Sequence, residues 1–309
     1  MKGNQTAMDG KSVLAESKVV AIGGGHGLAV MLKALKGRVG QLSAVVTVAD
    51  DGGSSGRIRR ELGLVPPGDL RMCLSALADP ESALLSSFTY RFNGGDLAGH
   101  SLGNLMLAAL TDLLGGLGPA SRHMGMILGA SGLVFPSAEE PLGLLAETDQ
   151  GQLSGQVAIN ACSGIRRVWV EPQEPKVSTE ALEAILEADL LVLGPGSLFT
   201  SVLAACVVPA IREAIKSTTA QRVYVANLRQ QKAETAYLDQ ASQVEKVLEV
   251  IERIDGLLLD PNHNEVGDLS RVLAADVCVE AGSLSSDGGF THDSTLLANA
   301  LARVAEHNN

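Results

Sequence analysis

The sequence has few aromatic side chains and no excess of positive charge. Phe, Trp and Tyr make up 3% of the 309 residues, and 24 Lys and Arg residues are outnumbered by 35 Asp and Glu residues, which gives a net charge of −11. A nucleic-acid-binding surface needs basic side chains for the phosphates and, for single strands, aromatic rings on which bases stack. We therefore expect no nucleic-acid partner.

The sequence also lacks any paired cysteine pattern. Its four cysteines are far apart and form no CxxC motif; they are Cys73, Cys162, Cys206 and Cys278. Such spacing favours neither a disulfide framework nor a zinc site. We expect a reduced, cytoplasmic protein whose cysteines are small buried side chains.

No segment has the pattern of a signal peptide or a membrane span. Residues 1–18 are polar and contain no apolar core, so residues 1–17 are predicted to form a flexible tail. The uncharged run from Leu190 to Ile211 is long enough to cross a bilayer, but it contains a Gly-Pro-Gly-Ser turn and Pro209. A strand, a tight turn and a buried helix explain it better, so we expect no membrane insertion.

Short apolar runs that alternate with helical patterns predict an α/β fold. Residues 18–22 and 42–48 have the composition of buried parallel strands, and residues 28–36 between them have apolar positions at helical spacing. Further strands are predicted at 165–170, 189–193, 222–227, 256–259 and 275–280, and helices at 69–78, 101–114, 178–188, 200–217 and 240–254. The strand–helix–strand order predicts a Rossmann-like, doubly wound, mostly parallel sheet. We expect one domain over residues 18–309, with a helical insertion at roughly 66–120.

Turn-forming and polar residues follow four of the predicted strands, where an open parallel sheet binds its ligands. They are the glycine-rich residues 23–27, the pair Asp50-Asp51, the turn at 194–197, and Asn227. Residues 23–27 match neither GxGxxG nor a P-loop, so they fit either an anion-binding helix start or a tight turn without a ligand. His26 could donate to a phosphate or cap the turn.

The other candidates also leave two interpretations open. One of Asp50 and Asp51 could bind a ribose hydroxyl or Mg²⁺ while the other caps a loop, and the Gly/Ser stretch at 52–56 is either a phosphate-wrapping loop or a solvated turn. Ser197 could cap a helix or hold a phosphate oxygen. Asp69 is placed to cap the helix at 69–78, and His100 and Asn104 are spaced as neighbours on one helix face.

Seven motifs together resemble the YvcK family of bacterial gluconeogenesis factors, which is related to the phospholactate transferase CofD. They are GGGHGL (23–28), TVADDGGSSGRIRR (47–60), PPGDLRMCLSAL (66–77), YRF (90–92), GHSLGNLMLAAL (99–110), ADLLVLGPGSLFTS (188–201) and HDS (292–294). The resemblance extends from Lys18 almost to the C-terminus.

The resemblance implies a regulatory protein that binds a nucleotide sugar of the UDP-N-acetylglucosamine type. The role it implies concerns cell shape and envelope synthesis during growth on gluconeogenic carbon. The alternative is a CofD-like phosphotransferase, which joins a nucleotide-activated phospholactate to a deazaflavin with Mg²⁺ and has a GDP-type ligand. An NAD-dependent oxidoreductase is a third interpretation from the spacing of Asp50, but the missing GxGxxG disfavours it. The sequence leaves open whether the protein is a homo-oligomer.

The motif positions give the candidate ligand-binding residues. They are Gly24, Gly25, His26, Gly27, Asp50, Asp51, Ser54, Ser55, Asp69, Arg71, His100, Asn104, Gly194, Gly196, Ser197, Thr200, Asn227, His292 and Asp293, with Asp50 also the candidate Mg²⁺ ligand. The chain departs from many relatives at His26 and at residues 230–235. It also has Thr291 at a position where those relatives have Arg. Because Arg can bind a diphosphate through two hydrogen bonds and Thr cannot, Thr291 removes a cation that the ligand would otherwise meet.

Overall fold

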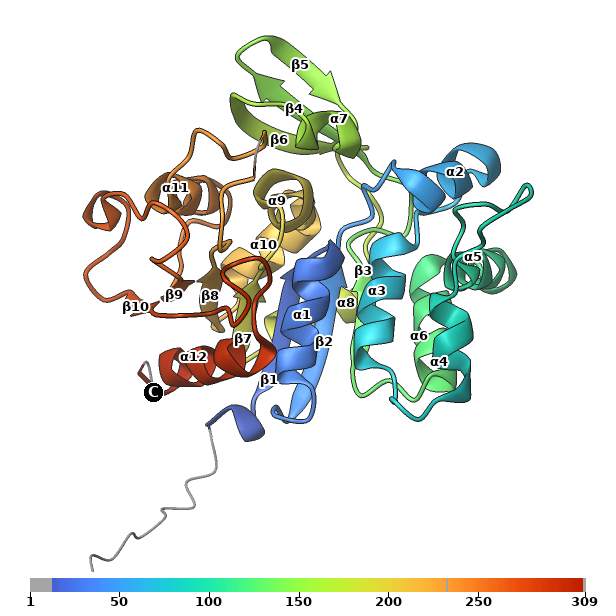
Figure 1. Ribbon diagram of the computed structural model, residues 1–309, viewed down its shortest axis with the longest axis horizontal. Helices are drawn as coiled ribbons and strands as arrows, with labels where there is room; N and C mark the ends of the chain where they lie inside the picture. The colour runs from blue at the N-terminus through green and yellow to red at the C-terminus, as the bar shows by residue number, and fades with distance from the viewer. Residues whose placement is uncertain (1–12, 232, 308–309) are drawn as a thin grey trace, which may run out of the picture.

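Seven parallel strands form the main sheet of the computed structural model, which describes residues 13–231 and 233–307 (Figure 1). The strands lie in the order β10-β9-β8-β7-β1-β2-β3, and every neighbouring pair is parallel. Their bounds are β1 (Lys18–Gly23), β2 (Gln41–Val46), β3 (Leu133–Pro136), β7 (Leu190–Leu193), β8 (Gln221–Val225), β9 (Gly256–Leu259) and β10 (Cys278–Ala281). The chain runs outward from β1 through β2 to β3 and then returns to β7 on the other side of β1. The predicted α/β, Rossmann-like fold is confirmed, and its switch point lies between β1 and β7.

Helices cover both faces of this sheet (Figure 1). On the near face α1 packs against α3 on one side and α12 on the other, while α8 and α10 pack together behind the sheet. The helices and helical turns are η1 (Val13–Ala15), α1 (Gly25–Leu35), α2 (Gly53–Leu62), α3 (Gly68–Leu77), α4 (Ala83–Thr89), α5 (Leu102–Leu114), α6 (Leu117–Ile127), α7 (Gln156–Asn160), α8 (Thr179–Leu186), η2 (Leu198–Val202), α9 (Leu203–Cys206), α10 (Pro209–Ser217), α11 (Gln240–Ile251), η3 (Leu269–Arg271) and α12 (Ser294–His307). Because both faces of the strands are covered, four residues of β1 are apolar and almost fully buried: Val19, Val20, Ala21 and Ile22.

The helical insertion is longer than the sequence indicates. Helices α2 to α6 extend from Gly53 to Ile127 and form the block to the right of α1 in Figure 1. The stretch at 52–56 is not an open phosphate-wrapping loop, because α2 begins at Gly53. A Cβ atom on Gly56 would lie 1.9 Å from the carbonyl oxygen of Asp51, so the glycine is needed for the sharp entry into this helix.

A second, three-stranded antiparallel sheet lies above the carboxyl ends of the main strands in Figure 1. Its order is β5-β4-β6, with bounds β4 (Gly143–Thr148), β5 (Gly151–Ser154) and β6 (Ile165–Glu171). The strand predicted at 165–170 is present as β6, but it belongs to this small sheet. The other two strands of this sheet were not predicted. Strand β5 is mostly exposed and has no apolar run.

The helix predicted at 200–217 is broken into three pieces. The π-helical segment η2 leads into α9, and α10 begins at Pro209, whose missing N–H suits the first position of a new helix. The first part, which consists of η2 and α9, meets α10 at an angle of 74°. Within residues 13–231 and 233–307 no single helix has both the length and the apolar composition to cross a membrane, although this bent pair passes that test jointly.

The segment before β1 is part of the packed structure from Val13 onward. Leu14 in η1 is 4% exposed and η1 packs against α12, whereas Val13 beside it is 41% exposed. The prediction of a flexible tail is therefore wrong for residues 13–17, because Leu14 has an apolar surface to cover. Residues 1–12 lie outside the described part of the chain.

We predict that Leu14→Ala lowers the free energy of unfolding by about 2–4 kcal/mol, since it removes a buried side chain and leaves a cavity. Urea denaturation followed by circular dichroism measures this change. Val13→Ala is the matched control and should shift the free energy by about 0.5 kcal/mol or less. Equal effects of the two substitutions would contradict the packing of η1.

Candidate functional site

The carboxyl ends of β1, β7 and β8 open into one cleft with a volume of about 490 Å³. The loop before α12 closes its far side. Eight of the predicted site residues line it: Gly24, Gly25, His26, Gly27, Gly196, Ser197, Asn227 and His292. Gly194 and Thr200, which were also expected to line it, are not among the lining residues. The cleft is thus assembled from segments far apart in the sequence that the parallel sheet brings together.

The first glycine turn exposes the start of α1 to this cleft. The helix begins at Gly25, which has a φ of +63° that glycine adopts without strain, and the residue before it, Gly24, has no side chain to cap it. The backbone N–H groups of His26 and Gly27 have no acceptor within the described residues. Free N–H groups and the helix dipole make this end of α1 attractive to an anion.

The second glycine turn packs directly against the first. A Cβ atom on Gly27 would lie 2.3 Å from the carbonyl oxygen of Pro195, so only glycine permits this approach. Asn227 fixes the second turn: its Oδ1 accepts from the N–H of Gly196 at 3.2 Å and its Nδ2 donates to the Gly196 carbonyl at 2.7 Å. The amide of Asn227 therefore holds the shape of the cleft wall.

A buried carboxylate occupies the start of η2. The Oε1 atom of Glu234 accepts from the backbone N–H of Phe199 at 2.6 Å and of Thr200 at 2.9 Å, and from the Thr200 hydroxyl at 3.3 Å. Glu234 is completely buried, and burial raises its pKa. The donors of Thr200, a predicted ligand contact, are thus satisfied by the protein's own carboxylate, and Thr200 does not line the cleft.

A second polar cluster lies under the first glycine turn. Asp69 is 7% exposed and accepts a hydrogen bond from the backbone N–H of Gly25, while Asp50 accepts from the N–H of Gly52 at 2.9 Å and from Ser55. Asp69 does not cap α3 as predicted. It is the second residue of that helix, and its side chain points to Gly25 instead.

Burial shifts the pKa of both carboxyl groups upward. For Asp50 desolvation is the main cause, and for Asp69 desolvation and the nearby charge of Asp50 raise the pKa to about 7. Two carboxylates that approach one another away from water cannot both ionise readily. Asp69 therefore holds a proton over part of the neutral pH range.

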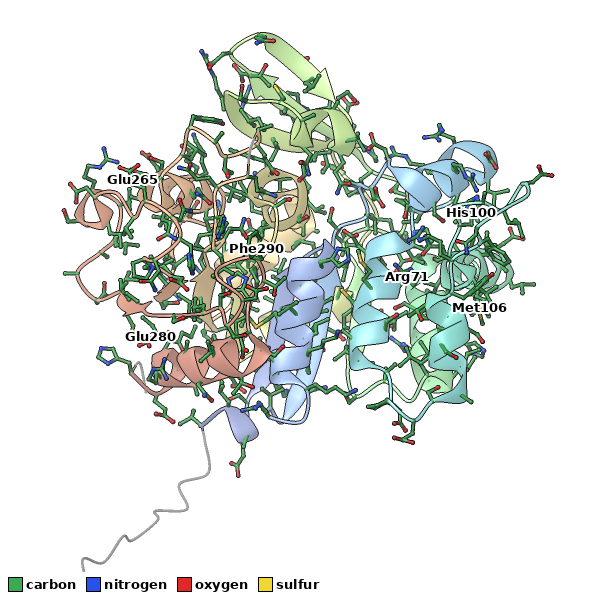
Figure 2. All side chains as sticks on the ribbon, viewed as in Figure 1. Arg71, His100, Met106, Glu265, Glu280 and Phe290 are labelled. Carbon is green, nitrogen blue, oxygen red and sulfur yellow. The ribbon has the colours of Figure 1, made fainter. Side chains whose placement is uncertain are left out.

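Four residues of the insertion form a hydrogen-bonded chain, and Figure 2 labels two of them, Arg71 and His100. Ser54 Oγ lies 2.9 Å from His100 Nδ1, Asn104 Nδ2 donates to Ser54 Oγ at 3.0 Å, and Arg71 Nε donates to Asn104 Oδ1 at 3.0 Å. His100 lies before α5 rather than on it, so it is not a neighbour of Asn104 on one helix face. The two side chains are instead connected by the hydroxyl of Ser54, which is hydrogen-bonded to both.

Comparison with known proteins identifies the family. The family model described as "2-phospho-L-lactate transferase CofD" matches residues 19–286. The chain belongs to the CofD family. Proteins named "Gluconeogenesis factor" are 45% identical in Halalkalibacterium halodurans, over 72% of this chain and 70% of that protein, and 44% identical in Bacillus subtilis, over 74% and 73%. A crystal structure of a UPF0052-family protein from Bacillus halodurans superposes with a TM-score of 0.86 at 34% identity, covering 93% of this chain and 98% of that one. The YvcK resemblance is confirmed.

Two motif residues of this CofD-family chain act as helix caps. Asp51 Oδ1 accepts from the backbone N–H of Val157 at the start of α7, at 3.0 Å. Asp293 Oδ1 accepts from the N–H groups of Thr295 and Leu296 in α12. The prediction that both contact the ligand is not supported by their positions, since neither lines the cleft.

Gln231, Arg229 and Phe290 are among the cleft residues of this CofD-family chain that were not predicted from the sequence. Gln231 Nε2 donates to Ser197 Oγ at 2.6 Å, and Arg229 donates to the carbonyls of Gly288 and Gly289 with its guanidinium 4.4 Å from the ring centre of Phe290. Phe290 is 75% exposed at the mouth of the cleft. Arg229 follows Asn227 by two residues, and that spacing after a strand end is the one signal that could have found it.

Two acceptor atoms beside the cleft have no partner within the described residues: Gln231 Oε1 and His292 Nε2. The imidazole of His292 is held by the carbonyl of Ala226, and burial lowers its pKa to about 4. His292 is therefore neutral at pH 7, and its free nitrogen accepts rather than donates. Both atoms suit a ligand that brings hydroxyl or N–H donors.

The Asp69 pKa predicts a distinctive pH dependence of stability. Because its pKa is higher in the folded chain than in the unfolded chain, folding favours the protonated form, and stability falls as pH rises from about 4 to about 7. Asp69→Asn removes this loss while keeping an oxygen to accept from Gly25. The variant should gain on the order of 3 kcal/mol relative to the unmodified protein between these pH values.

Urea denaturation at several pH values between 4.5 and 8 measures this gain. Asp96→Asn, at an exposed position of the insertion, controls for the loss of one charge. A difference between Asp69→Asn and the unmodified protein that stays constant with pH would show that the Asp69 carboxyl is not perturbed.

Proposed function

We propose that this chain is a regulatory protein that binds a nucleotide sugar of the UDP-N-acetylglucosamine type in the cleft. One observation carries the proposal: two free backbone N–H groups at the start of α1 face the same cleft as two unpartnered acceptors, Gln231 Oε1 and His292 Nε2. A diphosphate offers acceptors to the first pair, and the sugar or base of a nucleotide offers donors to the second.

The cleft has further features that fit such a ligand. Its volume of about 490 Å³ is in the range of cofactor-sized sites. The exposed ring of Phe290 offers a stacking surface for a base, and Arg229 holds the backbone around that ring. Thr291 donates to Asp287 Oδ2 at 2.6 Å, so it orders this loop instead of supplying charge to a phosphate.

Mg²⁺ would complete the charge balance of this site. Within the described residues no three His, Cys, Asp or Glu side chains form a metal cage. Mg²⁺ needs no such cage, because it commonly takes one or two carboxylates together with ligand phosphates and water. Asp50, a half-buried carboxylate whose charge acts on Asp69 behind the cleft wall, is the one we assign to it.

The regulatory role is inferred from the relatives and from the site. The relatives of Halalkalibacterium halodurans and Bacillus subtilis are named gluconeogenesis factors. We extend that role to this chain, acting in the cytoplasm on cell shape and envelope synthesis during gluconeogenic growth. The burial of Glu234, Asp50 and Asp69 against backbone donors favours a rigid binding site over a reactive one.

The alternative is a transferase of the CofD type. The observation that favours it is Asp69, a carboxyl with a pKa of about 7 beside the first glycine turn, because proton transfer near neutral pH needs such a group. In that case Asp69 would take the proton of an attacking hydroxyl, and His26 and Gly27 would bind the diphosphate of the activated substrate.

Isothermal titration with UDP-N-acetylglucosamine tests the binding site. Gln231→Ala removes a free acceptor and the hydrogen bond to Ser197, so affinity should fall about tenfold. Gln152→Ala, at an exposed position of β5, is the control and should bind as the unmodified protein does. If UDP-N-acetylglucosamine, UDP and GDP all fail to bind the unmodified protein at millimolar concentration, the proposal is wrong.

The choice between regulator and transferase is tested with Asp50→Asn. We expect the pure protein to leave UDP-N-acetylglucosamine intact for hours in the presence of Mg²⁺, as followed by phosphorus NMR. Asp50→Asn should weaken binding in Mg²⁺ and bring it to the level seen in EDTA. Steady conversion of a nucleotide substrate by the unmodified protein, lost in Asp50→Asn, would instead establish the transferase.

A further inference from the structure

A second cavity, of about 540 Å³, lies between the small sheet and helices α9, α10 and α11, away from the nucleotide cleft. We name it the β6 groove. It is lined by Arg166, Arg167, Val168, Trp169, Gln173, Phe199, Leu203, Arg212, Lys246, Glu249 and Val250. Its floor is apolar, since Phe199 and Leu203 are at most 2% exposed.

The groove runs along β6, whose outer edge pairs with no described strand; two carbonyls of β6 accept from side chains, Ile165 from Tyr237 and Val170 from Gln173. In the order β5-β4-β6, β6 pairs with β4 on one side, and no described strand pairs with its other side. Four consecutive residues of β6 line the groove, from Arg166 to Trp169. Because side chains alternate between the two faces of a strand, four in a row can line one cavity only if the cavity follows the edge of the strand.

The charge of the groove is opposite to that of the protein. Four cationic side chains and one carboxylate line it, although the whole chain carries a net charge of −11. The side chain of Arg212 makes no hydrogen bond or ion pair within the described residues, and its charge helps to lower the pKa of Glu252. Such a local excess of cations selects an acidic occupant.

The existing ion pairs of the groove can be exchanged at little cost. Arg166 pairs with Asp149 at 2.9 Å, and both side chains are more than 60% exposed. Arg167 pairs with Glu147 at 2.7 Å and lies over the ring of Trp169. Ion pairs in water are worth about 0–1 kcal/mol, so a carboxylate of a bound segment can replace Asp149 or Glu147.

We propose that the β6 groove binds an extended acidic segment of a partner protein, which adds to the free edge of β6 as a further strand of the small sheet. Backbone hydrogen bonds to β6 give affinity, and carboxylates on Arg166 and Arg212 select the acidic sequence. Apolar side chains of the segment, which alternate with its carboxylates, cover Trp169 and the floor. The site is separate from the nucleotide cleft, so it can be tested without any nucleotide.

Trp169 is the only tryptophan of the chain and reports on the groove directly. The probe is a capped ten-residue peptide of alternating Glu and Val, titrated into the full-length protein while tryptophan emission is recorded. A saturable change is expected with this peptide, and none with the same peptide carrying Lys in place of Glu. Isothermal titration checks both results.

Two protein variants test the assignment of the cations. The double substitution Arg166→Glu with Arg212→Glu should weaken binding by at least about tenfold. The control, Lys33→Glu with Arg38→Glu, makes the same change of charge at exposed positions on and after α1 and should bind normally. Circular dichroism and melting temperature verify that both variants fold.

A third peptide tests strand addition. Methylation of every second backbone nitrogen keeps the charges and side chains but removes N–H donors along one edge, so binding to β6 should be lost. Equal affinity of the methylated peptide, or loss of binding in the Lys33/Arg38 control, would overturn the proposal. Absence of binding by the acidic peptide would also overturn it, and would leave Arg166 and Arg167 as charges that only protect the free edge from aggregation.

Discussion

The parallel register of four neighbouring strands is the constraint on which the rest of the structure depends. Ile22 of β1 pairs with Val45 of β2 on one side and Leu193 of β7 on the other, and Leu193 pairs with Tyr224 of β8. The four strands therefore end at nearly the same level, and the loops that follow them must share one edge of the sheet. The contact between Gly27 and the backbone of Pro195 exists because β1 and β7 end side by side. A larger residue at Gly27 would separate the two walls of the cleft without touching any ligand.

The sequence was sufficient for six of the seven strands of the main sheet, all but β3, and for the edge at which polar residues gather. Buried parallel strands are continuous apolar runs, and the turn residues after them are visible without knowledge of the fold. Roles that depend on partners distant in the sequence were not predictable. Thr200 and Asp293 have the composition of ligand contacts, yet Glu234 satisfies the first and the second caps α12. Composition identifies a group that can bind an anion or a backbone N–H, and only the fold decides which of these it meets.

Buried carboxylates give this CofD-family site its character. Asp50, Asp69 and Glu234 are all directed at backbone N–H groups around the glycine turns, and burial raises the pKa of each. Each carboxylate uses donors that a phosphate would otherwise take, and at the start of α1 Asp69 takes the N–H of Gly25, which leaves those of His26 and Gly27. A site with this much internal negative charge suits a diphosphate that arrives with a cation. Gln231 and His292 then select the ligand by its donors, since both offer acceptors.

The segment η2 lies between the two cavities and contributes a side chain to each. Ser201 of η2 lines the cleft at the ends of β1, β7 and β8, while Phe199 of η2 lines the β6 groove, so one helical turn has a residue in each. Glu234 ties the start of this turn to the loop that also carries Gln231. Any ligand that displaces η2 on one side changes the free energy of binding on the other, and thermodynamic linkage requires the effect to be equal in both directions. In a protein built in this way, the affinity for a macromolecular partner depends on the concentration of the small ligand.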